Sequence, residues 1–493
     1  MRLVELMASQ DARAALTSDP EISGIAADSR AVRPGFLFAA LPGSTTDGRR
    51  FIADAVARGA VAVLAPVGTA LPPEAAAAVL LTDPNPRRRL AFLAAAFHQR
   101  QPERIAAVTG TNGKTSTADF ARQLWASCGR TAASLGTLGI VGPGVTRPGA
   151  LTTPDPVVLH ADLAMLADRG IDRLAIEASS HGLDQHRLDG VRIAYAAFTN
   201  LTRDHLDYHG TMDAYREAKL RLLTEVLMPS GTAVVNADSP EFDVLAERTR
   251  AASRRVVGYG RAARDIALVE DVPHADGQRL TIAIEGRRHV VDLPLVGGFQ
   301  AMNALAALGL VLADGVPEAT AVAGLGHLTG APGRLQRVAR LASGAAIYVD
   351  YAHTPDALTT ALGAMRPHTA GRLICVFGCG GDRDPGKRPG MGDAVARNAD
   401  VVIVTDDNPR GEVPATIRAA AIAGARAAGG DPIEIGDRHA AIAAGIDRLG
   451  PGDVLVIAGK GHEPGQTIGG QVLPFDDAAV SRELAVARGG APT

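Results

Sequence analysis

One segment of the chain combines glycines, a lysine and hydroxyl groups in the pattern of a phosphate-binding loop. It follows the apolar run 105–108 and precedes a helical pattern. The main-chain N–H groups of such a loop turn towards an anion, and the helix N-terminus adds partial positive charge. We predict that Lys114 contacts the β- and γ-phosphates of a nucleotide and that the Thr115 hydroxyl binds Mg²⁺. The residues of this loop are Gly110, Thr111, Asn112, Gly113, Lys114, Thr115 and Ser116.

The strict phosphate-loop pattern has a glycine where this chain has Val108. A tight turn between a strand and a helix, with an exposed lysine, is the alternative for the same residues. Because glycine, lysine and threonine occur together between a strand and a helix, the pattern favours a nucleotide site.

Two further segments carry side chains that are able to bind a metal ion. Glu177 ends the apolar strand 174–176, where the Mg²⁺ carboxylate of such folds belongs. An exposed strand-end glutamate is the alternative, and the preceding phosphate loop favours the metal. The segment 199–209 is rich in metal-capable residues, including His205, but their spacing selects no site. Lys219 lies on a helical pattern that by itself indicates a surface lysine.

The last third of the chain alternates strands and helices. This alternation is typical of a doubly wound parallel sheet, which binds ligands at the carboxyl ends of its strands. Polar residues and glycines gather where the strands end, so we expect this edge to bind a polar ligand. The predicted strands are 346–350, 373–377, 401–405, 433–435 and 454–458, and the polar ends are 350–353, 378–384, 406–410 and 459–463.

Breaks in these patterns divide the chain into three α/β domains. One helix ends before Pro102, and the Gly/Pro-containing segment 330–334 forms a second linker. The N-terminal loop 42–49 is rich in glycine and hydroxyl groups, which suits a diphosphate or sugar, although composition alone favours a plain surface loop. In the central domain we expect antiparallel strands at 280–284 and 289–293. The predicted domains are 1–102, 103–331 and 332–493.

Composition sets limits on the class of protein. The 493 residues are 46% hydrophobic and 21% charged, as in ordinary globular proteins. A net charge of −3 and an aromatic content of 4% argue against a nucleic-acid surface. Three cysteines form no disulfide framework, and we expect Cys375 and Cys379 to be buried at a strand end instead of binding metal. The N-terminus lacks a signal core and no apolar run is long enough to span a bilayer, so we expect a cytoplasmic protein.

Six segments together resemble the Mur ligases, and the resemblance covers essentially the whole chain. The phosphate loop alone is shared with folylpolyglutamate synthetases. The run Asp407-Asn408-Pro409-Arg410 is more specific, because it resembles the signature of the branch that adds meso-diaminopimelate instead of L-lysine. The segments are 28–30, 110–115, 177–181, 200–207, 350–355 and 407–410.

The resemblance implies a UDP-sugar-binding α/β domain, a central ATPase domain with a parallel sheet, and a C-terminal Rossmann-like domain. It also implies an ATP-dependent amide ligase. ATP would phosphorylate the γ-carboxylate of D-glutamate in UDP-MurNAc-L-Ala-D-Glu, and the amine of diaminopimelate would attack the acyl phosphate. The products would be ADP, phosphate and the tripeptide precursor of peptidoglycan, with roles in cell-wall biogenesis, cell shape and cell division.

Site roles follow from the resemblance residue by residue. Thr115 and Glu177 would hold one Mg²⁺, and His205 and Lys219 a second, with Lys219 carbamylated as in the family. A lysine held neutral near a cation can add CO₂, and the metal stabilises the anion that forms. Lys114, Glu177, His205 and Lys219 would be the catalytic residues. Outside the phosphate loop, Asn303, Arg334 and Asp350 would bind ATP.

The remaining matched residues would bind the two other substrates. Arg410 suits a carboxylate by bidentate pairing, and Glu463 suits the distal ammonium. The UDP-MurNAc-dipeptide would be bound by Ser29, Ser44, Thr45, Thr46, Thr152, Thr153, Ser179, Gln185 and Arg187. Diaminopimelate would be bound by Arg383, Asp407, Asn408, Pro409, Arg410, Gly459 and Glu463.

Two departures from the family pattern and several alternatives accompany this interpretation. Gln300 replaces a frequent asparagine near Asn303, and Ser116 replaces a frequent threonine. The rivals are a folylpolyglutamate-synthetase-like ligase, a ligase that uses L-lysine or LL-diaminopimelate, and a nucleotide-gated binding protein without ligase chemistry. We expect small-molecule partners alone, domain closure during turnover, and a monomer, although no pattern in the chain sets the oligomeric state.

Overall fold

The computed structural model describes residues 1–7, 18–43 and 46–493. They form two compact units, which are described separately below. Helix α10 (Gly298–Ala313) runs from the second unit into the first. The first unit comprises Met1–Tyr259 and Ala306–Pro317, and the second comprises Gly260–Leu305 and Glu318–Thr493.

The N-terminal part of the first unit is a four-stranded parallel sheet in the order β1-β2-β3-β4. This N-terminal part ends with helix α3 (Pro86–His98). The Asn85 side chain caps the helix by accepting a hydrogen bond from the main-chain N–H of Arg88, and Pro86 has a φ angle that suits the first helical position. The other elements are α1 (Leu3–Met7), β1 (Gly24–Ala26), β2 (Phe36–Ala39), α2 (Ile52–Ala57), β3 (Ala60–Pro66) and β4 (Val79–Asp83).

The rest of the first unit is built on a mostly parallel sheet in the order β12-β11-β10-β5-β9-β6-β7-β8. The first six of these strands are parallel, and β7 and β8 are antiparallel. Strand β5 lies inside the sheet, between β9 and β10, so the loop after β5 opens where parallel strands end on both sides. The strands are β5 (Arg104–Thr109), β6 (Ala132–Gly136), β7 (Gly139–Gly142), β8 (Val145–Arg147), β9 (Arg173–Glu177), β10 (Ile193–Phe198), β11 (Leu227–Asn236) and β12 (Arg255–Gly260).

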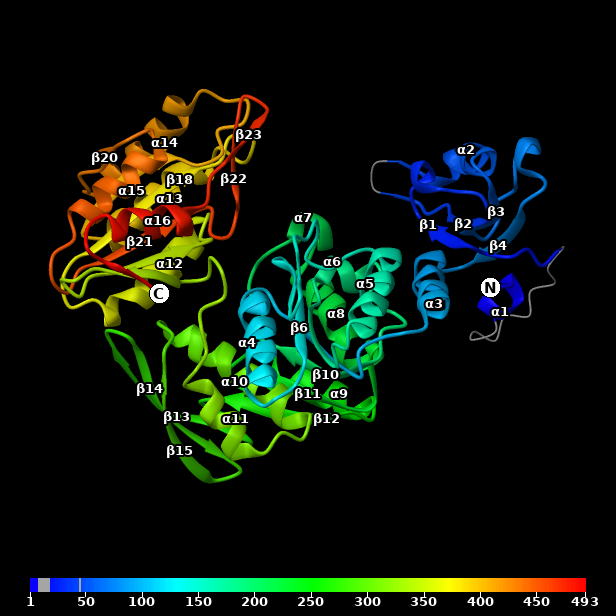
Figure 1. Cartoon of the computed structure of the whole chain (residues 1–493), viewed down its shortest axis with the longest axis horizontal. Helices are drawn as coiled ribbons and strands as arrows, with labels where there is room; N and C mark the ends of the chain where they lie inside the picture. Colours follow the sequence, from blue (N-terminus) through cyan, green and yellow to red (C-terminus); the bar gives the residue numbers. More distant parts are fainter. Residues whose placement is uncertain (8–17, 44–45) are drawn as a thin grey trace. The chain divides into compact units, whose positions relative to one another are not determined.

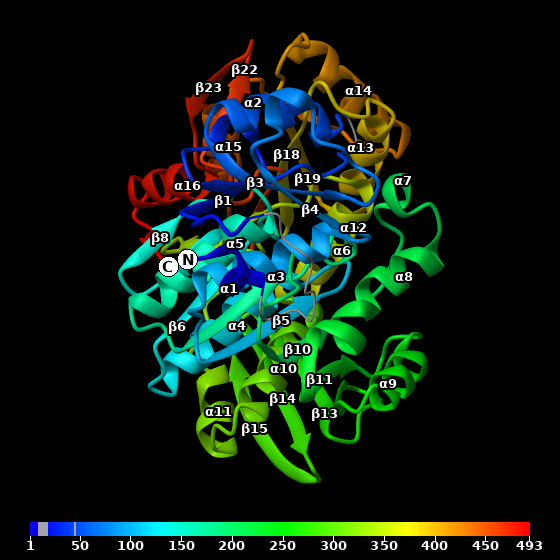
Figure 2. The ribbon, with the colours of Figure 1, turned by 90° about the vertical axis from the view of Figure 1, so that its right-hand side faces the viewer.

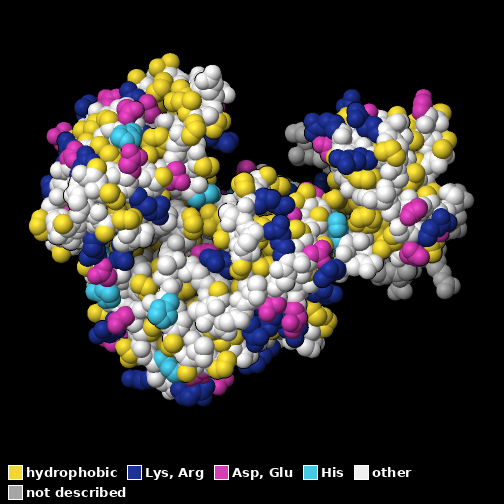
Figure 3. Space-filling view, viewed as in Figure 1, with side chains coloured by type: hydrophobic (Ala, Val, Ile, Leu, Met, Phe, Trp, Pro, Cys, Tyr) yellow, Lys and Arg dark blue, Asp and Glu magenta, His cyan; other side chains and the backbone are white. Residues whose placement is uncertain are grey.

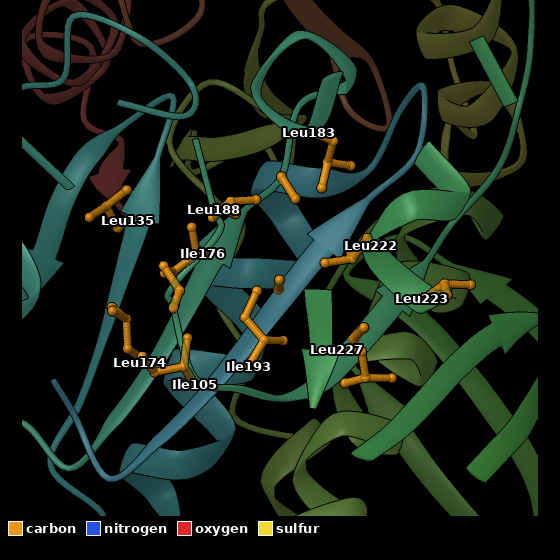
Figure 4. Packing of buried hydrophobic residues seen from close by; sticks show 14 of the residues in the cluster. Ile105, Leu135, Leu174, Ile176, Leu183, Leu188, Ile193, Leu222, Leu223 and Leu227 are labelled. Atoms are coloured by element: carbon orange, nitrogen blue, oxygen red, sulfur yellow. The ribbon is translucent and has the colours of Figure 1, made fainter. Parts of the chain in front are cut away.

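Helices cover both faces of this sheet. Figure 4 shows the core on one face, where Ile105, Ile176 and Ile193 of the strands pack with leucines that include Leu222 and Leu227. Helix α4 covers the other face, on the opposite side of β6 from α5 (Figure 1). The helices are α4 (Lys114–Ser127), α5 (Pro156–Asp168), α6 (Ser180–Asp184), α7 (Leu206–His209), α8 (Met212–Arg221), a π-helical turn (Leu222–Val226) and α9 (Phe242–Ala251).

Asp189 joins three segments of the first unit. Its carboxylate accepts hydrogen bonds from Arg88 of α3 at 3.0 Å and from Arg221 of α8 at 2.7 Å, and His186 lies 3.5 Å away. The Asp189 side chain is 4% exposed. Burial raises the pKa of Asp189, but the hydrogen bonds from His186 and Arg221 outweigh it, so the pKa is held below its ordinary value.

The second unit contains an antiparallel meander and a seven-stranded sheet. The sheet order is β20-β19-β18-β21-β17-β16-β24, with its first five strands parallel. Strand β21, the last of the parallel strands in the sequence, lies between β17 and β18. The strands are β13 (Ile266–His274), β14 (Gly277–Ile284), β15 (Arg287–Leu293), β16 (Gln336–Arg340), β17 (Ala346–Asp350), β18 (Leu373–Cys379), β19 (Val401–Asp406), β20 (Ile433–Glu434), β21 (Val454–Ala458) and β24 (Ala491–Pro492).

Two separate cores pack against the faces of the seven-stranded sheet. Helices α12, α13 and α14 contribute to one core, and α15 and α16 contribute to the other. Figure 2 shows α13 and α14 on one side of β18 and β19, and α15 and α16 on the other. The helices are α11 (Glu318–Leu325), α12 (Pro355–Met365), α13 (Lys387–Asn398), α14 (Pro414–Ala427), α15 (Arg438–Asp447) and α16 (Asp477–Val486), and a hairpin consists of β22 (Gly465–Ile468) and β23 (Gln471–Pro474).

The predicted fold class is confirmed: the chain is α/β throughout, with parallel sheets in the N-terminal, central and C-terminal parts. The predicted strands 346–350 and 454–458 have the observed bounds. The short strands β6, β7 and β8 were not predicted from the sequence. The two boundaries predicted between the three domains stay predictions.

Two observations bear on the expectations from composition. Cys375 and Cys379 are buried in β18, as expected, and Cys128 is half-buried at the end of α4. Within residues 1–7, 18–43 and 46–493, no helix is both long and apolar enough to cross a membrane.

Candidate functional site

The loop between β5 and α4 has a backbone that only glycine allows at its first position. Gly110 has φ +146°, and a Cβ there would lie 1.9 Å from the Thr199 hydroxyl oxygen. Gly113 precedes α4 with φ +85° and gives the helix no side-chain cap. The first N–H groups of α4 therefore begin the helix without a capping side chain, which suits an anionic ligand.

Lys114 is the first residue of α4, and its side chain folds back over the loop. Its Nζ donates to the carbonyl oxygens of Gly110 and Thr111, each at 2.9 Å. The ammonium thus lies against the loop whose main-chain N–H groups would hold phosphates. The phosphate-binding role of Lys114 stays a prediction.

Glu177, at the end of β9, is buried beside Thr115. Its Oε2 accepts from the Thr115 hydroxyl at 3.0 Å, and its Oε1 accepts from the main-chain N–H of Thr137 at 2.7 Å. A Cβ on Gly136 would lie 2.1 Å from Glu177 Oε1, so the carboxylate packs directly over a glycine. The structure thus brings together the hydroxyl and carboxylate that were predicted to share a metal ion, and their oxygen donors fit Mg²⁺.

Thr137 and Gly136 were not predicted as site residues. They belong to the β6–β7 hairpin, whose strands are only five and four residues long, so no clear hydrophobic alternation indicates them. The Thr137 hydroxyl also contacts Glu177 Oε2 at 3.2 Å and the hydroxyl of Thr152 at 3.1 Å.

Lys219 lies on α8 and is 1% exposed, so the interpretation as a surface lysine from its helical pattern alone is wrong. Its Nζ donates to the Gly110 carbonyl at 2.8 Å and lies 4.4 Å from the centre of the Tyr215 ring. Burial, with a smaller effect from the charge of Lys114, lowers the pKa of Lys219 well below its ordinary value. A neutral amine at the edge of a phosphate loop is the form that can react with CO₂.

His205 has a left-handed backbone with φ 52°, and its side chain is 46% exposed. Its ring centre lies 6.1 Å from that of Tyr215, the residue whose ring also contacts Lys219. His205 and Lys219, the two residues predicted to bind the second Mg²⁺, therefore both lie near the ring of Tyr215. Among the described residues, no group of three or more His, Cys, Asp or Glu side chains is arranged to hold a metal ion. The predicted ligands instead include the Thr115 hydroxyl and a modified lysine.

A cavity of about 870 Å³ in the first unit gathers several residues predicted to bind the UDP-sugar substrate. Arg187, at its edge, donates to the Thr153 carbonyl at 2.7 Å and to Gln185 at 2.8 Å. Basic side chains gather on the N-terminal part of the chain in the space-filling view (Figure 3). Ser29, Thr46, Gln185 and Arg187 line the cavity, together with the unpredicted residues Arg30 and Arg87.

Three other predicted substrate residues, Thr152, Thr153 and Ser179, do not line this cavity. The Thr153 hydroxyl donates to the Glu177 carbonyl at 2.8 Å and accepts from the Ser179 main chain at 3.0 Å. Ser179 caps α6 through Gly182. Thr152 contacts Thr137 as described above. Ser44 and Thr45 lie outside the described residues.

In the second unit, the residues predicted to bind ATP form a connected set. Gln300 accepts from the Asn303 amide at 3.1 Å and donates to the Arg334 carbonyl at 2.9 Å. The Arg334 guanidinium lies 4.8 Å from the centre of the Tyr351 ring. Asp350 accepts from the main chain of Leu335 at 2.7 Å, and burial raises the pKa of Asp350 although the Arg334 charge opposes it.

The predicted diaminopimelate residues gather at the carboxyl ends of β18, β19 and β21. Arg410 has φ 51° and donates from Nη1 to the Gly381 carbonyl at 2.6 Å. Asn408 donates to Glu463 at 2.9 Å. A Cβ on Gly459 would lie 2.6 Å from Asp407 Oδ2, so that turn requires glycine. Pro409 is buried, and Arg383 is exposed on the loop after β18.

Comparison with known proteins agrees with this arrangement. Family models match at residues 21–98 (Mur ligase family, catalytic domain), 108–311 (Mur ligase middle domain) and 333–461 (Mur ligase, glutamate ligase domain). The chain belongs to the Mur ligase family. Mur ligases are ATP-dependent ligases, so the loop after β5 is the expected place for the ATP phosphates.

Two relatives and one solved structure are similar to this chain over nearly its whole length. One relative is a protein of Bradyrhizobium diazoefficiens named UDP-N-acetylmuramoyl-L-alanyl-D-glutamate--2,6-diaminopimelate ligase. Its sequence is 52% identical to this chain, and the match covers 98% of this chain and 99% of that protein. The protein of that name in Caulobacter vibrioides is also 52% identical and covers 94% of this chain and 95% of its own. A solved structure with the same name has a TM-score of 0.71 and 36% identity, and covers 95% of each chain.

Proposed function

We propose that this chain is an ATP-dependent ligase that joins meso-diaminopimelate to the γ-carboxylate of D-glutamate in UDP-MurNAc-L-Ala-D-Glu. The product would be the tripeptide precursor of peptidoglycan, formed with release of ADP and phosphate. The observation that carries this proposal is the pairing of Asn408, in the Asp-Asn-Pro-Arg run, with Glu463 at 2.9 Å. This pair of an amide and a carboxylate, two residues along the chain from Arg410, supports a site for an amino acid with two charged ends.

The activation step needs a phosphate donor held against the acceptor carboxylate. Lys114 and the main-chain N–H groups of the loop would hold the ATP phosphates, and Thr115 and Glu177 would hold Mg²⁺. Bound Mg²⁺ would neutralise charge on the phosphate oxygens. Phosphorylation converts a poor leaving group into a good one, so the task of the protein is positioning and charge neutralisation.

The carbamate proposed for Lys219 is supported by the environment of its amine. The side chain is buried, lies near Lys114 and has a lowered pKa, so the neutral amine is available to add CO₂. The product would carry an anionic carboxylate-like group beside His205. We propose that these two residues hold the second Mg²⁺.

The amino-acid step assigns complementary charges to the two ends of diaminopimelate. Arg410 would pair with the distal carboxylate and Glu463 with the distal ammonium, while the other amine attacks the acyl phosphate. L-Lysine lacks the distal carboxylate, so loss of this pairing would discriminate against it.

Phosphate release in a purified-enzyme assay tests the function. We expect release from ATP to require both UDP-MurNAc-L-Ala-D-Glu and meso-diaminopimelate, with LL-diaminopimelate and L-lysine as matched alternatives. Release that needs neither substrate would support a nucleotide-gated binding protein. The rival folylpolyglutamate-synthetase-like ligase is disfavoured by relatives that match nearly the whole chain. We also propose that the protein is a monomer, that it lies in the cytoplasm, and that it acts in cell-wall biogenesis and cell division.

A further inference from the structure

Lys460 is one of four lysines among the 50 basic residues of the chain, the others being Lys114, Lys219 and Lys387. It follows β21 directly, and its side chain is 0% exposed. Most basic residues of the chain are arginines, but this buried position carries the compact ammonium of a lysine. Arginine presents a wide planar fork with five donors, whereas lysine presents three donors at one point.

The Lys460 ammonium reaches three acceptors. Nζ donates to Glu463 Oε2 at 3.0 Å, to Asn408 Oδ1 at 3.3 Å and to the main-chain carbonyl of Gly465. These three bonds match the three N–H donors of an ammonium, so the charge is buried with its hydrogen bonds complete.

The acceptors of Lys460 also bond one another. Asn408 donates from Nδ2 to Glu463 Oε2 at 2.9 Å, and its Oδ1 accepts the main-chain N–H of Thr467 at 2.8 Å. Hydrogen bonds at both Nδ2 and Oδ1 therefore fix the orientation of the Asn408 amide. Both bonds to Glu463 end on Oε2, so Oε1 is the oxygen that a ligand would reach. The Glu463 side chain is 35% exposed, which is consistent with such access.

We propose that Lys460 is a positioning residue that sets selectivity for the distal ammonium of diaminopimelate by holding Glu463 and Asn408 in place. The inference rests on the function proposed above. Lys460 would contact no substrate atom and would act through the orientation and charge of Glu463. The requirement is for a single compact cation, because one point must satisfy a carboxylate, an amide oxygen and a main-chain carbonyl together.

The electrostatics of the pair agree with this assignment. Burial raises the pKa of Glu463, but the charge of Lys460 and the hydrogen bonds from Asn408 and Lys460 outweigh it. Glu463 therefore has a lowered pKa and is ionised when an ammonium arrives. Without Lys460, burial would act on the carboxyl group with less opposition.

Two amino acids that differ at one group give the test. 2-Aminopimelate keeps both carboxylates and the reacting amine of diaminopimelate but lacks the distal ammonium. For Lys460→Met we expect the KM for diaminopimelate to rise about 10- to 100-fold, as for lost hydrogen bonds to a charged group. The KM for 2-aminopimelate, for ATP and for the UDP-linked dipeptide should change less than about threefold.

A double-mutant cycle separates positioning from general stability. We expect Lys460→Met to add little to the KM effect of Glu463→Gln, because the lysine acts through that carboxylate. Arg397→Met is the control, since Arg397 forms an exposed pair with Asp393 on α13 and should leave all KM values unchanged. If Lys460→Met fails to fold, Lys460→Gln, which keeps a polar donor, replaces it.

The results distinguish the role proposed for Lys460 from the function proposed for the whole protein. Equal KM changes for both amino acids, an unchanged KM for diaminopimelate, or failure of both variants to fold would overturn the role of Lys460. If the wild-type protein does not use diaminopimelate at all, the proposed function fails and this inference fails with it. A wild-type protein active on diaminopimelate with an unaffected variant overturns the inference alone.

Discussion

The side-chain nitrogen of Lys219 lies 2.8 Å from the main-chain carbonyl oxygen of Gly110, the first residue of the phosphate loop. A helix residue more than a hundred positions along the chain thus closes the side of the loop. The same carbonyl accepts from Lys114 at 2.9 Å. Two amines therefore converge on one oxygen, and the buried amine is the one whose pKa is strongly lowered.

We expect Lys219→Ala to abolish turnover, because the variant loses the group that would become an anionic metal ligand. Added bicarbonate should not restore activity, whereas short-chain carboxylates should restore part of it by occupying the vacated volume. Phosphate release with all three substrates measures both effects. Full activity of Lys219→Ala would exclude the carbamate.

We expect Arg410→Ala to raise the KM for diaminopimelate by one to two orders of magnitude, the equivalent of about 2–3 kcal/mol for a charged hydrogen-bonded pair. Arg410→Lys should recover only part of this, because an ammonium cannot pair with a carboxylate in the bidentate manner. Amino-acid kinetics identical to those of the wild-type protein would show that Arg410 does not bind the substrate.

We expect Gly136→Ala to lower turnover about 10- to 100-fold, because displacing a catalytic group by about 1 Å has effects of that size. The added Cβ would lie 2.1 Å from Glu177 Oε1 and would push the carboxylate away from Thr115. The measurement is the rate of phosphate release at saturating substrates. Gly363→Ala on α12 is the matched control, since nothing lies within 4 Å of its Cβ.

We expect Asp189→Asn to lower the melting temperature at pH 7 by about 5 °C, the effect of losing charged hydrogen bonds of about 2 kcal/mol. The pKa of Asp189 is lowered in the folded protein, so its stabilisation is complete above the unfolded pKa of about 3.9. It is lost as the pH falls through the lower folded pKa.

The difference in melting temperature between wild type and Asp189→Asn should therefore shrink below about pH 4. Thermal unfolding between pH 3 and pH 8 measures it. Asp243→Asn, at an exposed position on α9, should show no such difference at any pH. A gap that widens on acidification would contradict the assigned direction of the pKa shift.

The phosphate loop and the strand ends of the C-terminal sheet could be predicted because their signals are local. Gly110 and Gly113 require backbone conformations that only glycine adopts readily, and these positions are visible as letters in the sequence. The strands β17 and β21 are long apolar runs bounded by polar residues, so their bounds also followed from pattern.

The burial of Lys219 and the contacts of Thr137 could not be predicted in this way. Lys219 lies on a polar-looking helix, and only the packing of α8 beside the β5–α4 loop buries it. Thr137 lies in a hairpin whose two strands are too short to show a clear hydrophobic period. The role proposed for Lys219 came from the resemblance to a family, whereas the burial that supports this role comes from tertiary structure.

The three thiols of the chain differ in burial, because β18 encloses two of them and the third lies at the end of a helix. Burial raises the pKa of Cys379 to about 12 and raises that of Cys375 as well, so neither thiol forms the reactive thiolate near neutral pH. Cys128 lies half-buried at the end of α4, about 20 Å along the helix from Lys114. We expect a maleimide dye to attach at Cys128 without any mutation and to report on the helix whose other end we propose binds the nucleotide.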